Sequence, residues 1–435
     1  MIDPTERESR RARTAGSASR DRTLLFGAKA LRALGYGSLS AFLFLYLTAL
    51  GVPPGESLFV TALTLVGTAV WSLVVLPLVV RRAGRRRAVQ LFAGLFALSA
   101  GLFFVATGPV TILASVLLGG VAASSADNGP LASLDAAILP QLARGRSRTA
   151  PFAQYNVLAN FSAAGGALLV AVPGIFAPIP GVSSLGLGPR PWILLAYLVF
   201  ALGSYAAVRG LSSAIEVGGP PAEEARPLPP RARRTVRDLT ALFGLDAFAG
   251  GFTINPIIAA YFVLAWGATA AMVGGVLFAV GAVSALSLFA AQYLADRIGL
   301  LPTMVFTHLP SNVLLIAVPF MPSFGWAFGV LLARYGLSQM DVPTRQAYAM
   351  HVVAPVDRAR ASAVLSGTRS VAQSAGPFPG AALLGAGWLG APLVLAGSLK
   401  VVYDALLWRR FRREPLVEGT DSPDRPTTVP RSKDP

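Results

Sequence analysis

Long apolar stretches, separated by short polar ones, occupy most of this chain. A helix needs about 20 mainly apolar residues to cross the hydrocarbon core of a bilayer. The glycines and prolines inside these stretches are tolerated better in membrane helices than in soluble ones. The pattern predicts an all-α membrane protein with twelve transmembrane helices, at residues 23–48, 58–80, 88–107, 110–132, 152–175, 191–209, 239–264, 270–294, 300–320, 324–344, 362–384 and 388–408.

The composition supports a membrane protein. Of the 435 residues, 54% are hydrophobic and 13% are charged, whereas soluble domains carry about 25% charged residues. The chain has no cysteine, which excludes disulfides and thiolate metal sites, and it has only two histidines, His308 and His351. Because no nucleotide-binding loop and no catalytic constellation can be assembled, we expect no enzymatic activity, no metal site and no other cofactor.

The net charge of +16 is distributed unevenly along the chain. Thirty of the 37 basic residues fall in segments predicted on one side of the membrane, one (Arg190) falls on the other side, and six lie within helices. The excess predicts that this side is cytoplasmic and holds both termini of a multi-pass protein of the plasma (inner) membrane. Anionic lipid accounts for the basic surface, so no nucleic-acid partner is expected.

The polar segments divide the chain into five parts. A cytoplasmic tail is expected at 1–22, a six-helix half at 23–209, a Pro- and Gly-rich cytoplasmic linker at 210–237, a second six-helix half at 238–412, and a disordered tail at 413–435. Rare charged residues and glycines recur between the halves, which indicates an internal repeat. The matched pairs are Arg32 and Asp246, Asp127 and Asp341, and Gly84 and Gly299, at offsets of 214, 214 and 215 residues.

The loop after the second helix carries a recognisable motif. Arg82, Gly84 and Arg85 match Gly-x-x-x-Asp-Arg-x-Gly-Arg-Arg, the signature of the major facilitator superfamily, although Pro77 and Arg81 replace its first glycine and its aspartate. A second copy keeps Asp296, Arg297 and Gly299 after the eighth helix.

Over residues 22–412 the chain resembles this family of secondary transporters. The resemblance implies a monomer in the lipid bilayer, two halves that rock around a central site for a small-molecule substrate, and signature residues that brace the cytoplasmic closure.

Charged residues inside the predicted helices are candidates for this site, because each costs about 2.5–3.5 kcal/mol to place in the hydrocarbon zone. Arg32 and Asp246 occupy equivalent places on the first and seventh helices. They form either a substrate or proton-coupling site, in which protonation of Asp246 frees Arg32 for an anionic group, or a permanent ion pair that joins the halves. The sequence leaves both interpretations open.

The tenth helix is the most polar. Asp341 and Arg345 are four residues apart and can pair on one helix face, and Pro343 between them predicts a kink. With Asp127 they are expected to form a structural gate network rather than a proton-coupling site, because they lie near the cytoplasmic side. Arg334 and Arg369 lie deeper, and for these two the sequence does not separate anion binding from pairing with Asp341 or with carbonyl groups.

Uncharged polar residues complete the candidate list. His308 on the ninth helix either relays protons or serves in packing and hydrogen bonding. Tyr36 on the first helix and Asn156 and Asn160 on the fifth bond either a substrate or a neighbouring helix.

The leading functional hypothesis is a secondary transporter that exports an organic compound, a drug or a metabolite, in exchange for protons. The alternative is a transporter of an anionic metabolite that uses the basic residues within the membrane. A non-transporting receptor or scaffold is retained as a third class, because Arg81 alters the transport signature.

Overall fold

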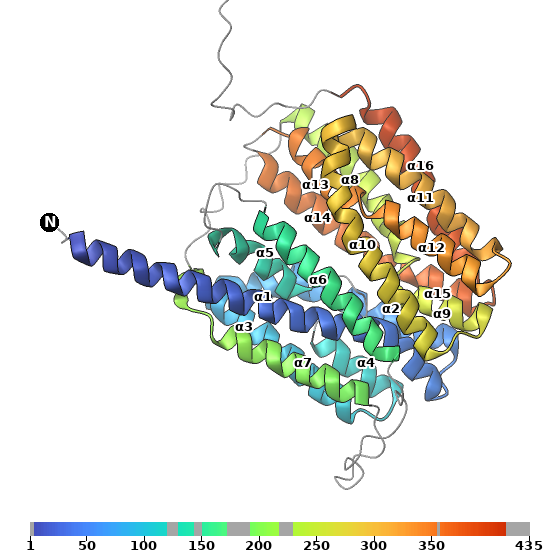
Figure 1. The fold of residues 1–435 in the computed structure, drawn as a ribbon, viewed down its shortest axis with the longest axis horizontal. Helices are drawn as coiled ribbons and strands as arrows, with labels where there is room; N and C mark the ends of the chain where they lie inside the picture. The colour runs from blue at the N-terminus through green and yellow to red at the C-terminus, as the bar shows by residue number, and fades with distance from the viewer. Residues whose placement is uncertain are drawn as a thin grey trace, which may run out of the picture.

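A computed structural model describes residues 4–119, 129–142, 150–171, 192–216, 229–354 and 357–414. These residues are almost entirely helical, and no strand occurs among them. Seven helical stretches in the described ranges are long and apolar enough to cross a membrane. Figure 1 shows the helices of the N-terminal half in blue to green and those of the C-terminal half in yellow to red.

The helices of the N-terminal half match the predicted segments, with three differences. The first helix, α1, begins at Pro4 rather than at residue 23. One helix, α3, continues through the second and third predicted helices, and the chain turns inside it at Gly84. The predicted fourth segment, 110–132, is too short, because helical structure extends to Leu142. The elements are α1 (Pro4–Ala49), α2 (Pro54–Val70), η1 (Trp71–Val75), α3 (Leu76–Val105), α4 (Pro109–Leu118), α5 (Pro130–Leu142), α6 (Ala150–Leu168), η2 (Leu169–Ala171), α7 (Trp192–Arg209) and η4 (Ser213–Glu216).

Three predicted helices of the C-terminal half are each divided into two pieces. With each pair of pieces counted as one passage, the described helices are consistent with twelve passages in two halves. The elements are α8 (Pro230–Gly251), α9 (Asn255–Trp266), α10 (Ala270–Ile298), α11 (Leu300–Ala317), η5 (Val318–Phe320), α12 (Phe324–Ser338), α13 (Asp341–His351), α14 (Arg358–Ala375), α15 (Pro377–Gly385) and α16 (Ala391–Phe411).

The break between α12 and α13 has a local cause. Pro343 has no N–H group to donate to the carbonyl of Gln339, four residues earlier, so the regular helical ladder is interrupted there. The backbone tightens instead, and the N–H of Val342 donates to that carbonyl at 3.3 Å. The kink predicted from Pro343 is therefore present, and it falls within the charged part of this passage.

The backbone itself shows the internal repeat. The turn at Gly84 has φ 80° and ψ 171°, and the turn at Gly299 has φ 90° and ψ 165°. Gly51 and Gly267, which follow α1 and α9, also have positive φ angles, of 85° and 62°. Residues with a side chain rarely adopt positive φ angles, so the two halves place glycines at equivalent turns for the same steric reason.

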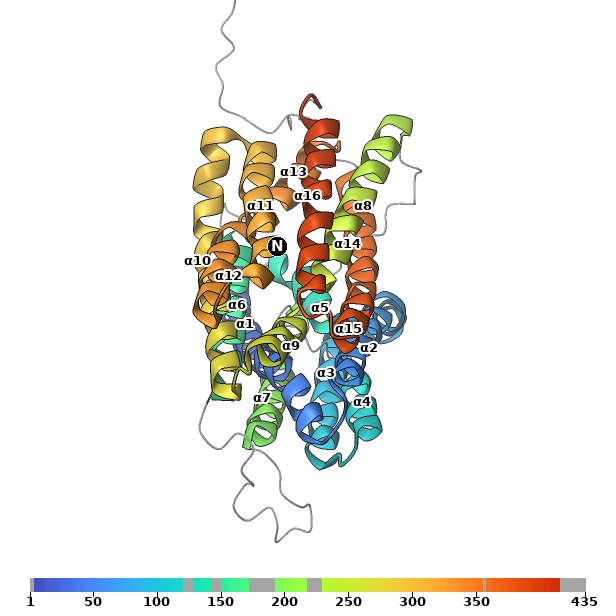
Figure 2. The same cartoon turned by 90° about the vertical axis from the view of Figure 1, so that its right-hand side faces the viewer.

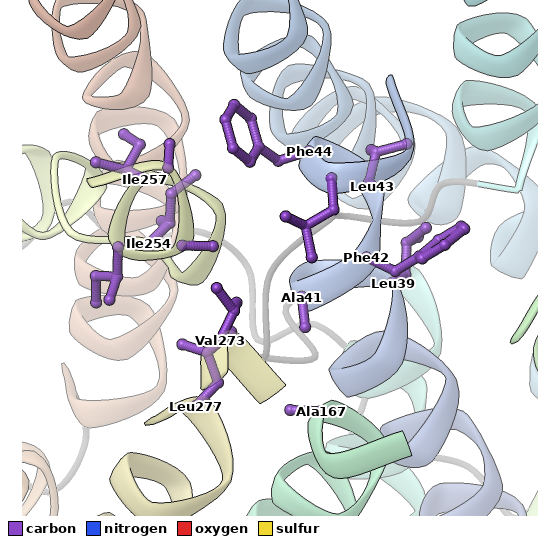
Figure 3. Close-up of a cluster of buried hydrophobic side chains, with 14 of the residues drawn as sticks. Leu39, Ala41, Phe42, Leu43, Phe44, Ala167, Ile254, Ile257, Val273 and Leu277 are labelled. Atoms are coloured by element: carbon purple, nitrogen blue, oxygen red, sulfur yellow. The ribbon is translucent and has the colours of Figure 1, made fainter. Parts of the chain in front are cut away.

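The buried apolar residues form one core at one end of the bundle and two cores at the other. We call the end that carries Arg86, Arg209, Arg297 and Arg410 the basic end. At the opposite end a single core joins both halves. Figure 3 shows α1, with Ala41 and Phe44 labelled, next to the segments of the C-terminal half that carry Ile254, Ile257, Val273 and Leu277.

At the basic end each half has a core of its own. One is formed by residues of the N-terminal half, including Leu25, Leu134 and Ile215. The other is formed by residues of the C-terminal half, including Leu239 and Phe411. Among the described residues, the halves therefore share an apolar core only at the opposite end. Figure 2 views the molecule with α2, α9 and α15 of this end in front.

Small residues allow the halves to approach at the opposite end. In α10 a Cβ atom on Gly281 would lie 2.8 Å from the Cβ of Ala164 in α6. In the same way, a Cβ on Gly55 in α2 would lie 3.0 Å from the Cα of Gly385 in α15. Such contacts let helix backbones come close enough for van der Waals packing, which is a main driving force for helix association in membranes.

Two adjacent glycines of α10 test this packing. We expect Gly274→Ala to lower the free energy of unfolding by about 1–3 kcal/mol, because its Cβ would lie 2.9 Å from the backbone nitrogen of Ala171. The control is Gly275→Ala, whose Cβ meets no atom within 4 Å and which should be neutral or slightly stabilising. Thermal unfolding of both variants in detergent measures the difference, and equal unfolding temperatures would contradict the packing described.

Candidate functional site

One carboxylate of the C-terminal half is surrounded by cations from three other helices. Asp246 in α8 accepts from Lys400 Nζ of α16 at 2.5 Å, and from Nη1 of Arg345 in α13 and Nη1 of Arg369 in α14, each at 3.0 Å. The Asp246 side chain is 4% exposed. Because a lone buried carboxylate is strongly unfavourable, these cations are what allows Asp246 to remain ionised. We call Asp246 and its contacts below the charge cluster.

A second carboxylate joins the charge cluster through Arg345. The Nη1 atom of Arg345 also lies 2.6 Å from Asp341 Oδ2, one helical turn earlier in α13. Arg345 thus bridges two buried carboxylates, and the pairing expected from the i,i+4 spacing of these residues is present. The contact to Asp246 could not be predicted from spacing, because 99 residues separate the partners.

His308 of α11 lies between two carboxylates. Its Nε2 atom is 3.8 Å from Asp246 Oδ1, and its Nδ1 atom is 2.9 Å from Asp404 Oδ1. Asn312, one turn further along α11, donates to Asp404 Oδ2 at 2.9 Å. His308 therefore connects the charge cluster to Asp404 of α16.

Close helix packing brings these side chains together. A Cβ atom on Gly251, the last residue of α8, would lie 2.7 Å from the Cα of Gly376, the residue between α14 and α15. The two helices therefore approach closely at this point, and the guanidinium of Arg369 in α14 reaches Asp246 in α8. Arg369 is also the most accessible cation of the charge cluster, with 26% of its side chain exposed.

The N-terminal half contains a separate buried ion pair. Arg32 of α1 donates to Asp135 of α5, and both side chains are fully buried. The hydroxyl of Tyr155 in α6 donates to the same carboxylate oxygen, and Lys29 Nζ lies 4.8 Å from the centre of the Tyr155 ring. Arg32 is thus neutralised within its own half.

This pair corrects one of the two interpretations of Arg32 and Asp246. They do not form an ion pair between the halves, because Asp135 neutralises Arg32 and the cations of the charge cluster neutralise Asp246. The sequence analysis missed Asp135 because the fourth apolar segment was ended at residue 132. The buried apolar residues Leu131, Leu134 and Ile138 lie at helical spacing on both sides of Asp135. This pattern indicates that the helix continues past residue 132.

Arg334 of α12 is buried without an ion pair. The residue is 4% exposed, and its guanidinium carbon lies 4.2 Å from the centre of the Tyr335 ring. Its Nε atom is enclosed and has no hydrogen-bond partner. Among the residues that the structure describes, no carboxylate lies within ion-pair distance of Arg334.

The uncharged candidates occupy two different environments. Tyr36 is buried, and its ring lies 5.4 Å from that of Phe96 within the N-terminal half. Asn156 is exposed and Asn160 is partly exposed. They lie on the same side of α6 as Ala164, which packs against α10. This side of α6 therefore faces the other half and becomes accessible towards the basic end.

The signature loop uses an acidic residue from elsewhere in the chain. The carboxylate of Glu216 in η4 accepts the backbone N–H groups of Arg85 at 3.0 Å and of Arg86 at 2.9 Å. Arg82 is exposed, and Gly84 has a φ angle of 80°, which residues with a side chain rarely adopt. Glu216 thus supplies a carboxylate to a loop in which Arg81 replaces the expected aspartate.

The other predicted gate residues do not join the charge cluster. Asp296 and Arg297 are exposed at the end of α10, where Arg297 lies 4.3 Å from the centre of the Tyr293 ring, and Gly299 makes the following turn. Asp127 lies outside the described residues. Within the described ranges, no group of three histidine or acidic side chains is arranged to hold a metal ion.

Two comparisons of sequence found similar proteins. Residues 240–433 match the family model of the Major Facilitator Superfamily. Over 423 residues the chain is 22% identical to the "Uncharacterized membrane protein YJR124C" of Saccharomyces cerevisiae, and the match covers 90% of this chain and 94% of that protein.

Solved transporters have the same fold. The human organic anion transporter MFSD10 (TETRAN) is 17% identical, with a TM-score of 0.62 over 90% of this chain and 99% of that one. A bacterial homologue of the human lysosomal transporter Spinster, in an inward-facing and occupied conformation, is 15% identical, with a TM-score of 0.68 and coverages of 91% and 97%. An auto-inhibited peptide transporter of the POT family is 12% identical, with a TM-score of 0.71 and coverages of 93% and 99%.

The apolar spans make the chain a multi-pass membrane protein. The family model matches its C-terminal half, and the likeness to solved transporters is a likeness of fold.

A double-mutant cycle tests the charge cluster. We expect Asp246→Asn to lower the free energy of unfolding by about 3–5 kcal/mol, because three cations would then surround an uncharged amide. Adding Lys400→Met removes one of these cations and should recover much of the loss. Thermal unfolding of the single and double variants measures the coupling. If the double variant were no more stable than Asp246→Asn alone, the contact between Asp246 and Lys400 would not be the stabilising one.

The role of Glu216 is tested at its carboxylate. We expect Glu216→Ala to lower the free energy of unfolding by about 1 kcal/mol, as does the loss of a residue that caps a helix N-terminus. Glu216→Gln keeps an amide oxygen that can accept one of the two N–H groups, so its stability should lie between those of Glu216→Ala and the wild type. The order of the three unfolding temperatures is the measurement, and equal values for Glu216→Ala and the wild type would contradict this role.

Proposed function

We propose that the protein is a secondary transporter that moves a small organic solute across the plasma membrane by alternating access and uses protons as the coupling ion. We place the basic end in the cytoplasm and treat the working unit as a monomer. The observation that supports alternating access best is the asymmetry of the apolar cores. One core joins the halves at the opposite end, whereas each half has its own core at the basic end.

The asymmetry corresponds to one of the two conformations that such a transporter needs. Apolar packing closes the opposite end, and the absence of a shared core permits the halves to separate at the basic end. If the basic end faces the cytoplasm, as the arginine distribution favours, this conformation is open to the cytoplasm. The reverse conformation requires the contacts around Gly55 and Gly281 to break and a new contact to form at the basic end.

Proton coupling is proposed at Asp246. The ionised carboxylate holds Lys400, Arg345 and Arg369 together. A proton on Asp246 would weaken these three contacts at once and make the cations available to other partners. His308, 3.8 Å from Asp246 Oδ1, is positioned to pass a proton between Asp246 and Asp404.

The charge of the solute decides the direction of coupling. A cationic solute competes with the proton for Asp246, so solute and proton cross the membrane in opposite directions. This exchange is the export expected from the sequence. An anionic solute binds the cations that protonation of Asp246 releases, so solute and proton cross the membrane in the same direction. The second candidate function, transport of an organic anion, is favoured by the buried Arg334, which has no ion-pair partner among the described residues.

Proteoliposomes that contain a fluorescent pH indicator test the proposal. We expect the addition of a transported solute, found by screening organic cations and anions, to change the internal pH in vesicles that contain the wild type. Asp246→Asn combined with Lys400→Met should abolish this proton movement, because the coupling carboxylate is absent while the charges of the cluster stay balanced.

The control is Asp238→Asn, on the same helix, where Asp238 is an exposed partner of Arg410 at the basic end. It should leave proton movement unchanged. Proton movement that persists without the Asp246 carboxylate would place the coupling site elsewhere, and the absence of movement with every solute would favour a receptor or scaffold.

A further inference from the structure

Arg334 is a buried cation of the C-terminal half without a carboxylate partner among the described residues. Three cations of this half contact carboxylates directly, and Asp404 is bound by His308 and Asn312. Arg334 contacts none of the described carboxylates, although an ionised group in the hydrocarbon zone costs several kcal/mol without a partner. The cations described within the spanning helices of this half are Arg334, Arg345, Arg369 and Lys400. The carboxylates described there are Asp246, Asp341 and Asp404.

Arg334 lies on the same face of its helix as the charge cluster. Ser338, Asp341 and Arg345 follow it at intervals of four, three and four residues, and all four side chains are buried. The residues that join α12 to α13 keep right-handed helical backbone angles, so this face continues across the break. Arg334 therefore lies about 10 Å along the helix axis from Asp341, on the side away from the basic end.

The surroundings of Arg334 fit an organic anion. The Tyr335 ring, 4.2 Å from the guanidinium carbon, covers the cation, and stacking on an aromatic ring leaves the N–H edge of a guanidinium available for two parallel hydrogen bonds to a carboxylate. Leu331, one turn before Tyr335, belongs to the apolar core. A solute with one carboxylate and an apolar body would find complementary groups for both parts.

We propose that Arg334 is the binding site for the carboxylate of the transported solute, which is therefore an organic anion. This inference rests on the proposed transport function and adds the substrate class. The solute enters from the basic end past Arg369, the most accessible cation of the charge cluster, and its carboxylate ends on Arg334. A proton on Asp246 supports this binding by leaving the charge cluster more positive.

An unpaired buried arginine destabilises the protein when no ligand is bound, and this predicts an unusual effect of mutation. Arg334→Gln should leave the unliganded protein as stable as the wild type or more stable, because a buried charge without a partner is removed. Arg345→Gln, which leaves two carboxylates without their shared cation, should lower the unfolding temperature. A structural role of Arg334 would make both variants unstable.

Ligand binding is measured on the detergent-purified protein without added anionic lipid. The probes are lactate, hexanoate and benzoate, each beside its uncharged amide. We expect at least one carboxylate to raise the unfolding temperature of the wild type and its amide not to do so. Arg334→Gln should weaken the binding of that carboxylate about 10- to 100-fold, the value of a hydrogen bond to a charged group. Arg412→Gln, at the exposed end of α16, should bind it like the wild type.

Several results would overturn the proposal. One is equal stabilisation by carboxylates and amides, a second is carboxylate binding that survives Arg334→Gln, and a third is the absence of stabilisation by all three carboxylates.

A failure of this proposal can be distinguished from a failure of the proposed transport function. Carboxylate binding at Arg334 without proton movement in vesicles would remove the proposed function and leave the site. Proton-driven transport of an uncharged or cationic solute that is unaffected by Arg334→Gln would remove the site and leave the function.

Discussion

An ionised side chain inside a membrane protein needs a partner of opposite charge, and the C-terminal half is organised around this constraint. Asp246 draws one cation from each of α13, α14 and α16, and His308 of α11 links it to Asp404. Five helices are thus held by a single carboxylate. A change in its charge acts on all five at once, so the same interaction is suited to stabilise the half and to respond to a proton.

The two halves satisfy their charges separately, and this has a mechanical consequence. Arg32 pairs with Asp135 in one half while Asp246 is neutralised in the other, so neither of these pairs resists separation of the halves. The core that joins the halves is apolar, with close approaches at small residues such as Gly55 and Gly281, and Asn255 adds a hydrogen bond to Ser40 at 3.3 Å. Contacts of this kind are weak individually, which is what a reversible opening requires.

Some of the site could be predicted from spacing alone. Asp341 and Arg345 are neighbours on one helix turn, and Pro343 interrupts the same turn, so pairing and kink followed from local rules. Asp135 was missed because the predicted apolar segment ended at residue 132, although apolar residues continue beyond it. The contact between Glu216 and the signature loop joins residues 130 positions apart, and no local pattern contains information of that kind.

The sequence by itself determined that this is a membrane protein of two related halves, because hydrophobic length, arginine distribution and repeated glycines are properties of single helices and turns. It also determined which charged residues had to be explained, since their insertion cost depends only on their place in an apolar segment. Only the tertiary structure decided which charges neutralise each other and that Arg334 is left without a carboxylate among the described residues. The reason is that an ion pair depends on distance, and distances between helices are set by packing at positions such as Gly251 and Gly376, far apart in the chain.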